Sequence, residues 1–240
     1  MSEEIKNRAR ELLRSGSVDV VIGYKRASDG ISAKPCFVFR EPDASVLIFD
    51  DKCTYNLSNY IKDFAGKKIG IIAKPADIKA ITVLRQEKQL KPEDIIIIEA
   101  GTFRKTGDAP EQAGTLDERA KAWEEEFSLC IRCYACRQIC PMCYCPTCVA
   151  DQTMPQWFSK AVNLKGNFSW NVTRAMHLAG RCIGCGECER ACPAGIPLMK
   201  INRKIEKDVM ELFNYEAGAS PEQKPLLACF NKNDPQDFIK

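Results

Sequence analysis

Two copies of one cysteine pattern constrain this chain more than any other feature of its sequence. The pattern is C-x2-C-x2-C-x3-C-P, and its members are Cys130, Cys133, Cys136, Cys140 and Pro141, then Cys182, Cys185, Cys188, Cys192 and Pro193. Three thiolates at this spacing can surround one corner of a metal cluster. The fourth cysteine follows a longer gap beside a turn-forming proline, so it points away. Each copy can therefore supply its fourth cysteine to the other.

The run resembles the signature of bacterial two-cluster ferredoxins, in which the fourth cysteine ligates the other cluster. This resemblance implies two [4Fe–4S] clusters. The ligands of one would be Cys130, Cys133, Cys136 and Cys192, and those of the other Cys182, Cys185, Cys188 and Cys140. Zinc sites and disulfides are the alternatives. A zinc site needs two pairs of ligands and no third cysteine at the same step, so two full copies favour iron–sulfur clusters.

Composition sets the broad class of the protein. A length of 240 residues predicts one or two domains, and 45% hydrophobic with 28% charged residues is ordinary for a soluble globular protein. The acidic start at Glu3 and Glu4 does not resemble a signal peptide, and no apolar run approaches the length of a membrane span. We therefore expect a cytoplasmic protein, in which fourteen cysteines indicate metal binding rather than disulfides.

The net charge bears on the binding partners of this protein, and the predicted clusters bear on its host organism. A net charge of +3 is too small to indicate nucleic acid or a membrane surface as a partner. Because exposed iron–sulfur clusters are sensitive to oxygen, we expect an anaerobic or low-oxygen host.

The N-terminal part predicts a small α/β domain over residues 1–102. Helical periodicity covers residues 2–15, and apolar runs predict strands at 18–24, 35–40 and 45–49, followed by a helix at 53–64. A strand at 68–74, a helix that begins at Pro75 and a strand at 95–98 form a βαβ unit, which indicates a parallel sheet.

The rest of the chain predicts a mainly α-helical domain that holds the two clusters. Glycine and proline mark residues 103–117 as a linker, and residues 118–216 form the helical ferredoxin domain. Its expected helices lie at 117–129, 171–179 and 198–213. The prolines of residues 217–240 predict an extended C-terminal tail.

The C-terminal half resembles the α-helical dicluster ferredoxins of succinate dehydrogenase iron–sulfur subunits and of the C subunit of heterodisulfide reductases. The resemblance rests on the two cysteine patterns, the helix before Cys182 and the stretch PAGIPLMKINRKI after Cys192. It implies that helices, rather than hairpins, frame the clusters.

The N-terminal half is similar to the β subunits of deazaflavin-reducing hydrogenases and formate dehydrogenases. The residues that carry this similarity are DDKCTYNLSNYI at 51–62 and KKIGIIAKPADIKAITVLRQEKQL at 67–90. The family uses FAD to reduce its coenzyme. Where the family often has a Gly-Cys-Asp-like segment, this chain has Lys74-Pro-Ala-Asp77, which counts against a bound FAD. Together the two halves resemble accessory subunits of heterodisulfide reductase-type, electron-bifurcating complexes.

Several further residues are candidates for metal binding or for tuning a cluster. Cys143, Cys145 and Cys148 could hold zinc or a third cluster, given a fourth ligand from Cys36, Cys53, Cys229 or His177. They could equally be buried thiols or alternative ligands of the second cluster. Cys36 and Cys53 are expected to be buried small hydrophobes, and His177 to be structural. The arginines in or beside the patterns, Arg132, Arg137, Arg181 and Arg190, are either surface charges or groups that tune the clusters or bind an acidic partner.

Electron transfer is the function that these features favour. The chain would relay electrons through two [4Fe–4S] clusters, as a subunit of a heterodisulfide reductase-linked complex, between heterodisulfide reductase-like subunits and dehydrogenase or hydrogenase subunits. With one histidine and no P-loop or G-x-G-x-x-G, the sequence offers no complete active site. The alternatives are a flavin-containing catalytic subunit that oxidises NAD(P)H or a deazaflavin, and a zinc-only interaction module.

Overall fold

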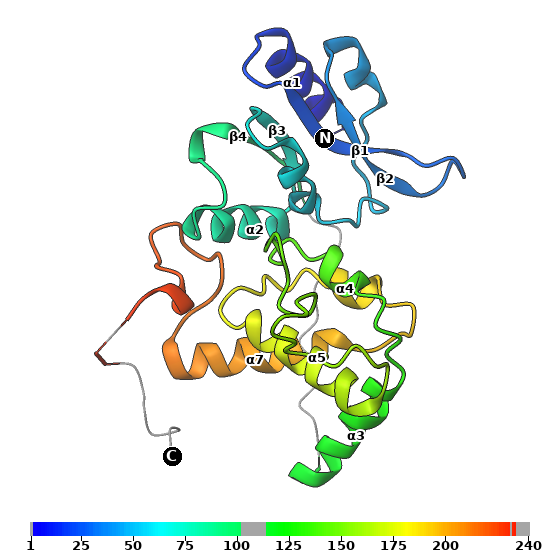
Figure 1. The fold of residues 1–240 in the computed structure, drawn as a ribbon. Coiled ribbons are helices and arrows are strands. Elements are labelled where there is room, and N and C mark those ends of the chain that lie inside the picture. The colour runs from blue at the N-terminus through cyan, green and yellow to red at the C-terminus, as the bar shows by residue number, and fades with distance from the viewer. Residues whose placement is uncertain (1, 102–113, 231, 234–240) are drawn as a thin grey trace. The chain divides into compact units, whose positions relative to one another are not determined.

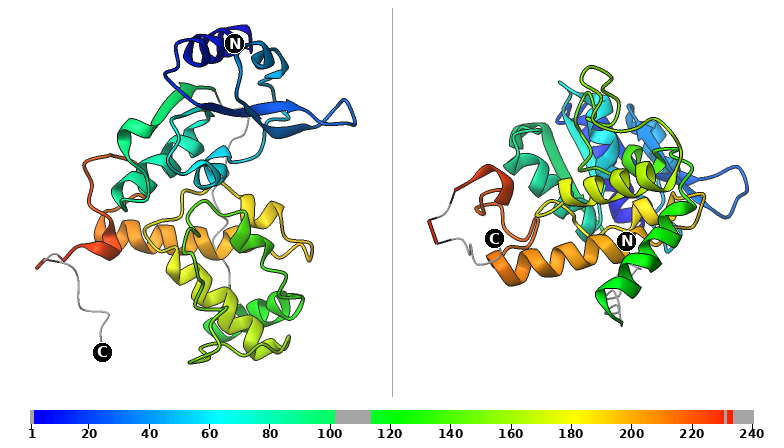
Figure 2. Two further views of the ribbon diagram at one scale, coloured as in Figure 1. Left: turned by 45° about the horizontal axis from the view of Figure 1, so that its top comes forward. Right: turned by 60° about the horizontal axis from the view of Figure 1, so that its bottom comes forward.

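The computed structural model describes residues 2–101, 114–230 and 232–233, and the chain divides into two compact units (Figures 1 and 2). The first unit comprises residues 1–106 and 218–225, and the second comprises residues 107–217 and 226–240. Most of the predicted linker lies outside the described residues. Of the predicted tail, residues 218–225 group with the first unit.

The first unit is built on a four-stranded mixed sheet in the order β2-β1-β3-β4. The strands are β1 (Val20–Arg26), β2 (Ala33–Val38), β3 (Ile69–Ala73) and β4 (Ile95–Glu99). β1 pairs antiparallel with β2, whereas the β1–β3 and β3–β4 pairs are parallel. β3 reads IGIIA and every residue in it is buried, as expected for the interior of a parallel sheet.

Helices lie against the sheet because their apolar residues face it (Figure 1). α1 (Ser2–Arg14) buries Ile5, Ala9 and Leu12, and ends before Gly16, whose φ of 67° is left-handed. α2 (Pro75–Gln86) begins with proline at its first position, as predicted, and links the parallel strands β3 and β4. A short 3-10 helix, η3 (Pro92–Asp94), leads into β4. The βαβ unit is confirmed.

One expectation for this unit is wrong, and another is confirmed with a later start. Residues 45–49 do not form a strand, because Pro42 starts a 3-10 helix, η1 (Glu41–Val46), and Ile48 then makes only an isolated bridge to Tyr24. The expected helix at 53–64 is a 3-10 helix, η2 (Leu57–Phe64), which Asn56 caps by accepting a hydrogen bond from the Ser58 amide. Asn56 therefore sets a later start than the apolar pattern indicated.

The second unit is helical. Its elements are α3 (Leu116–Ser128), α4 (Ala135–Gln138), α5 (Leu164–His177), α6 (Glu187–Arg190), α7 (Leu198–Phe213) and the 3-10 helix η4 (Leu226–Ala228). α5 packs on α3 and on α7, and the short helices α4 and α6 contact each other. Phe127, Trp170 and Ile196 lie in its apolar core. α3 and α7 match their predicted ranges closely.

The helix before the second cysteine pattern is longer than predicted. The sequence indicated residues 171–179, but α5 begins at Leu164, where the Asn163 side chain accepts a hydrogen bond from the Gly166 amide at 2.9 Å. The Asn163 cap at the N-terminus, rather than the apolar periodicity, sets this start.

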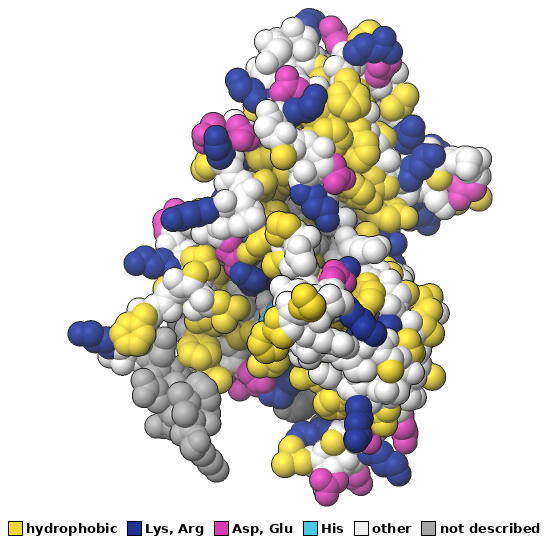
Figure 3. Space-filling view, in the orientation of Figure 1, with side chains coloured by type: hydrophobic (Ala, Val, Ile, Leu, Met, Phe, Trp, Pro, Cys, Tyr) yellow, Lys and Arg dark blue, Asp and Glu magenta, His cyan; other side chains and the backbone are white. Residues whose placement is uncertain are grey.

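The surface and the helices give two further observations. In Figure 3, basic and acidic side chains are interspersed over the visible face of the molecule. Across residues 2–101 and 114–230, no helix is both long enough and apolar enough to cross a membrane.

Candidate iron–sulfur centre

The two cysteine patterns share one backbone conformation. The second and fourth residues after the first cysteine of each copy have positive φ: Arg132 (57°) and Tyr134 (60°) in the first copy, Gly184 (66°) and Gly186 (75°) in the second. Tyr134 and Gly186 then precede the single-turn helices α4 and α6, which carry the third cysteine of each copy. The first copy keeps this loop with non-glycine residues, at a cost of roughly 1–2 kcal/mol each.

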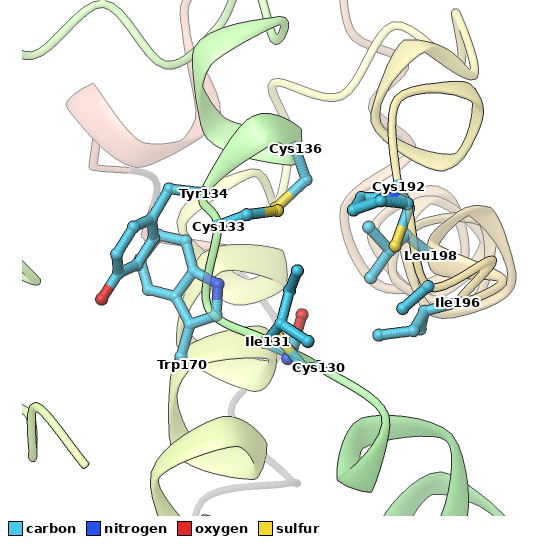
Figure 4. Close-up of a pocket in the computed structure, with 12 residues that line it drawn as sticks. Cys130, Ile131, Cys133, Tyr134, Cys136, Trp170, Cys192, Ile196 and Leu198 are labelled. Carbon is cyan, nitrogen blue, oxygen red and sulfur yellow. The ribbon is translucent and has the colours of Figure 1, made fainter. Parts of the chain in front are cut away.

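The first thiol set, defined as Cys130, Cys133, Cys136 and Cys192, surrounds one pocket. Figure 4 shows Cys133 and Cys136 on one wall of this pocket and Cys192 on the opposite wall. Ile131, Ile196 and Leu198 complete an apolar lining. Burial raises the pKa of Cys136 to about 11. Three cysteines of the first copy and the fourth of the second thus meet in one place.

α5 holds the backbone of the first copy through buried side chains. Asn167 donates from Nδ2 to the carbonyl oxygens of Phe127 and Cys130, at 3.1 and 2.7 Å. The Arg132 guanidinium donates back to the Gly166 carbonyl at 2.8 Å. Arg174, one helical turn from the end of α5, donates to the Cys136 carbonyl at 3.1 Å. The first copy is therefore tied to one helix along its length.

The second thiol set is defined as Cys182, Cys185, Cys188 and Cys140. Burial raises the pKa of Cys182, Cys185 and Cys188, and the Cys140 thiol, close to all three, raises each further. The fourth cysteine of the first copy is thus an electrostatic neighbour of the first three cysteines of the second copy. That these four cysteines share one cluster stays a prediction.

α7 supplies polar groups to the second thiol set. Asn202, which is buried, donates to the Cys188 sulfur at 3.6 Å. The Glu206 carboxylate lies beside Cys182 and pairs with Arg203 at 2.6 Å. Arg203 in turn donates to the Gly184 carbonyl at 3.3 Å, in the bend of the second copy. Amide donors to cluster sulfurs are one means by which proteins tune iron–sulfur potentials.

Cys143, Cys145 and Cys148 have separate surroundings. Cys143 donates a hydrogen bond to Cys140, which lowers the pKa of Cys140 and raises that of Cys143. Cys148 lies beside Arg137 and Cys145 is exposed. In the part of the chain that the structure describes, no three His, Cys, Asp or Glu side chains lie close enough to hold a single metal ion, either here or in the two thiol sets. Cys36 and Cys53 are buried in the first unit, Cys229 is exposed, and His177 is an exposed residue at the end of α5.

Most of the arginines that the sequence singled out have protein partners. Arg132 is buried and donates to backbone carbonyls, Arg137 pairs with Asp151 at 2.7 Å, and Arg190 pairs with Glu187. Arg181 donates to the Tyr144 hydroxyl at 3.0 Å. Their positive charges are therefore engaged by oxygen atoms.

The edge of the sheet after β3 contains a buried polar network. Lys74 donates to the Cys53 carbonyl at 2.9 Å and to the Tyr24 hydroxyl, while Asp77, fully buried, accepts from the Lys74 amide at 2.9 Å. Burial raises the pKa of Asp77 to about 6. A dinucleotide site at such an edge uses glycines that let phosphates approach the backbone. Lys74 and Asp77, bonded within the protein, do not fit a site of that kind.

The residues around the two thiol sets fit iron–sulfur clusters. Each set offers four cysteines, the usual ligands of a [4Fe–4S] cluster. The side chain of Arg174 also leaves a buried donor, Nε, without a hydrogen-bonding partner at the junction of the sets. The sequence did not indicate Arg174, Asn167, Asn202 or Glu206. Their only signal was that α5 and α7 adjoin the two patterns and contain polar residues at helical spacing.

Comparison with known proteins agrees with this geometry. Residues 129–197 match a 4Fe-4S dicluster domain family, which confirms the predicted iron–sulfur domain. The chain is also similar to the F420-dependent formate dehydrogenase subunit beta of Methanocaldococcus jannaschii, with 31% identity over 110 residues, or 44% of this chain and 27% of that protein.

A second relative covers more of the chain. F420-dependent formate dehydrogenase 1 subunit beta of Methanococcus maripaludis is 28% identical over 185 residues, or 77% of this chain and 44% of that protein. The chain thus spans less than half the length of these curated relatives. The predicted resemblance to formate dehydrogenase β subunits is confirmed.

Proposed function

We propose that this chain relays single electrons through two [4Fe–4S] clusters as a subunit of a formate dehydrogenase-like oxidoreductase complex. The first thiol set would hold one cluster and the second thiol set the other. The observation that carries this proposal is the pocket that Cys130, Cys133, Cys136 and Cys192 line together. Four cysteines could also hold zinc, and the match of residues 129–197 to a 4Fe-4S dicluster domain is what favours iron–sulfur clusters.

The protein's own residues position and insulate the two groups. When bound, the clusters supply one-electron redox chemistry. Tyr134 and Trp170, whose rings meet edge to face with centroids 4.9 Å apart, flank the first thiol set. Ile131, Ile196 and Leu198 limit the access of water to it. Asn202 gives the second thiol set a hydrogen bond to Cys188.

The wider assembly is also part of the proposal. The similarity of the C-terminal half to the C subunit of heterodisulfide reductases supports a heterodisulfide reductase-linked complex, with flavin-based bifurcation as one form of it. Partner dehydrogenase or hydrogenase subunits would supply and accept the electrons. We place the complex in the cytoplasm of an anaerobe.

A flavin-containing catalytic subunit is the second candidate. It is favoured by the similarity to subunits named F420-dependent, and such a subunit would oxidise NAD(P)H or a deazaflavin. The network of Lys74 and Asp77 at the edge after β3 argues for the relay instead, because these residues bond to the protein itself.

Metal and flavin analysis of protein purified without oxygen tests the proposal. The relay predicts about eight iron and eight sulfide per chain, with no flavin. One flavin per chain would favour the catalytic candidate. Additional iron or one zinc would support a third site at Cys143, Cys145 and Cys148. Protein that lacks iron, or that holds zinc alone, would overturn the proposed function.

A further inference from the structure

Among the described residues, Arg174 on α5 is a buried cation with no carboxylate at ion-pair distance. The residue is 4% exposed, and its Nη2 donates a hydrogen bond to the Cys136 carbonyl at 3.1 Å. Its Nε is buried and has no hydrogen-bonding partner. Burying an uncompensated charge costs several kcal/mol, so the protein must gain something from this placement.

Thiols from both sets surround this guanidinium. Burial by itself lowers the pKa of Arg174, but Cys188, Cys140, Cys136 and Cys143 together raise it above the usual arginine value. Cys188 and Cys140 belong to the second thiol set and Cys136 to the first. Arg174 also lies within hydrogen-bonding reach of the Cys188 sulfur. The guanidinium therefore borders the ligands of both clusters, with a hydrogen bond to the Cys136 carbonyl in the first thiol set and the Cys188 sulfur within reach in the second.

Two other arginines beside the cysteine patterns provide a contrast, because Arg137 and Arg190 are paired with Asp151 and Glu187. Arg132 is buried like Arg174, and it donates to backbone carbonyls. A paired guanidinium contributes little net field at a neighbouring cluster, because the carboxylate cancels most of it. Arg174 keeps its charge inside the protein, where the effective dielectric constant is low and screening is weak.

We propose that Arg174 raises the reduction potentials of both clusters. This inference rests on the proposed function. Reduction adds one negative charge to a cluster, and a fixed positive charge beside its thiolates stabilises that charge. In the transfer step one cluster loses the electron that the other gains, and no bond breaks. Arginine keeps its proton throughout, so no proton transfer is required.

The test is a redox titration of the protein with both clusters. Electron paramagnetic resonance monitors the reduced fraction of each cluster at every potential. The Cys133→Ser variant, which changes a ligand of the first thiol set alone, assigns the two signals. At a fixed potential we expect Arg174→Gln to lower the reduced-to-oxidised ratio of both clusters at least tenfold, which is about 59 mV for a one-electron couple.

Two further variants separate charge from packing. Arg174→Lys keeps the positive charge, so it should restore most of the ratio. Lys165→Gln removes one exposed positive charge from the same helix, so it should leave both ratios unchanged. Iron and sulfide are measured in every variant, which ensures that the ratios refer to intact clusters.

Three results would overturn the inference. Arg174→Gln could leave both ratios unchanged, Arg174→Lys could lower them as much as Arg174→Gln does, or Lys165→Gln could match the effect of Arg174→Gln. If Arg174→Gln does not fold, the lysine variant decides, because a wild-type ratio supports the role of charge and a tenfold fall contradicts it. Wild-type protein without iron would overturn the proposed function itself, whereas intact clusters with unshifted ratios would overturn only the role of Arg174.

Discussion

At the scale of single residues, the two glycines of the second cysteine pattern have the same backbone conformation but different surroundings. A Cβ at Gly184 would lie 2.5 Å from Arg203 Nη1, whereas a Cβ at Gly186 would meet nothing within 4 Å. Both have positive φ, so alanine is strained at either position. Comparing alanine substitutions at the two positions therefore measures the contribution of the contact between Gly184 and Arg203 of α7.

We expect Gly184→Ala to destabilise the protein by roughly 1 kcal/mol more than Gly186→Ala. The added methyl group displaces Arg203 and weakens its ion pair with Glu206, beside Cys182. Denaturant midpoints of the two iron-loaded variants, compared at equal iron content, provide the measurement. Equal midpoints would show that the Arg203 contact contributes nothing to stability.

Residue-scale prediction from the sequence succeeded for the cysteine spacing and failed for the residues around it. Cysteines three residues apart in the sequence stay close in space whatever the rest of the fold. Cys130, Cys133 and Cys136 could therefore be recognised as one group of ligands. Arg174 and Asn202 lie 38 and 14 residues from the cysteines that they contact, and the approach depends on how α5 and α7 pack. A contact between residues so far apart cannot be recognised from the local sequence.

At the scale of elements, α5 is the scaffold of the first cysteine pattern. Its Asn167 satisfies the carbonyl oxygens of Phe127 and Cys130, which end α3 and begin the pattern. The chain between the two patterns is thus more than a spacer, since this helix fixes where the first pattern lies relative to the core around Trp170.

Asn167→Ala should destabilise the second unit by about 1–3 kcal/mol, because two backbone carbonyls lose their donor in a buried place. It should also speed the loss of iron to a chelator, since Cys130 is no longer anchored. Ser169→Ala changes an exposed side chain of the same helix and is the matched control. Thermal unfolding and the rate of iron release check both effects. Equal rates in the two variants would refute the scaffold role of Asn167.

The elements that the sequence predicted correctly are those with long, regular apolar patterns. α1, α7 and the βαβ unit of β3, α2 and β4 belong to this group. The expected strand at 45–49 failed because Pro42 starts a 3-10 helix, and the expected start of α5 failed because Asn163 caps the helix seven residues earlier than the apolar pattern began. Capping and turn chemistry prevailed over periodicity in both places.

At the scale of the whole molecule, the chain combines a cofactor-binding helical unit with a small mixed α/β unit. The helical unit carries the chemistry that the cysteines imply. In the α/β unit, the buried Lys74 and Asp77 bond to the protein at the edge where parallel sheets often bind ligands. Both units could be predicted from the sequence. The polar network at that edge could be identified only in the structure, because Tyr24 and Cys53 come from separate segments.

The crossed arrangement of the fourth cysteines is the central claim, and paired substitutions test it most directly. Both variants carry Cys143→Ala, because Cys143 is hydrogen-bonded to Cys140 and could replace it. Cys133→Ala with Cys192→Ala should damage one cluster only and leave about four iron per chain, whereas Cys133→Ala with Cys140→Ala should damage both and leave almost none. The reverse result would mean that each pattern keeps its own fourth cysteine, and would contradict the crossed arrangement.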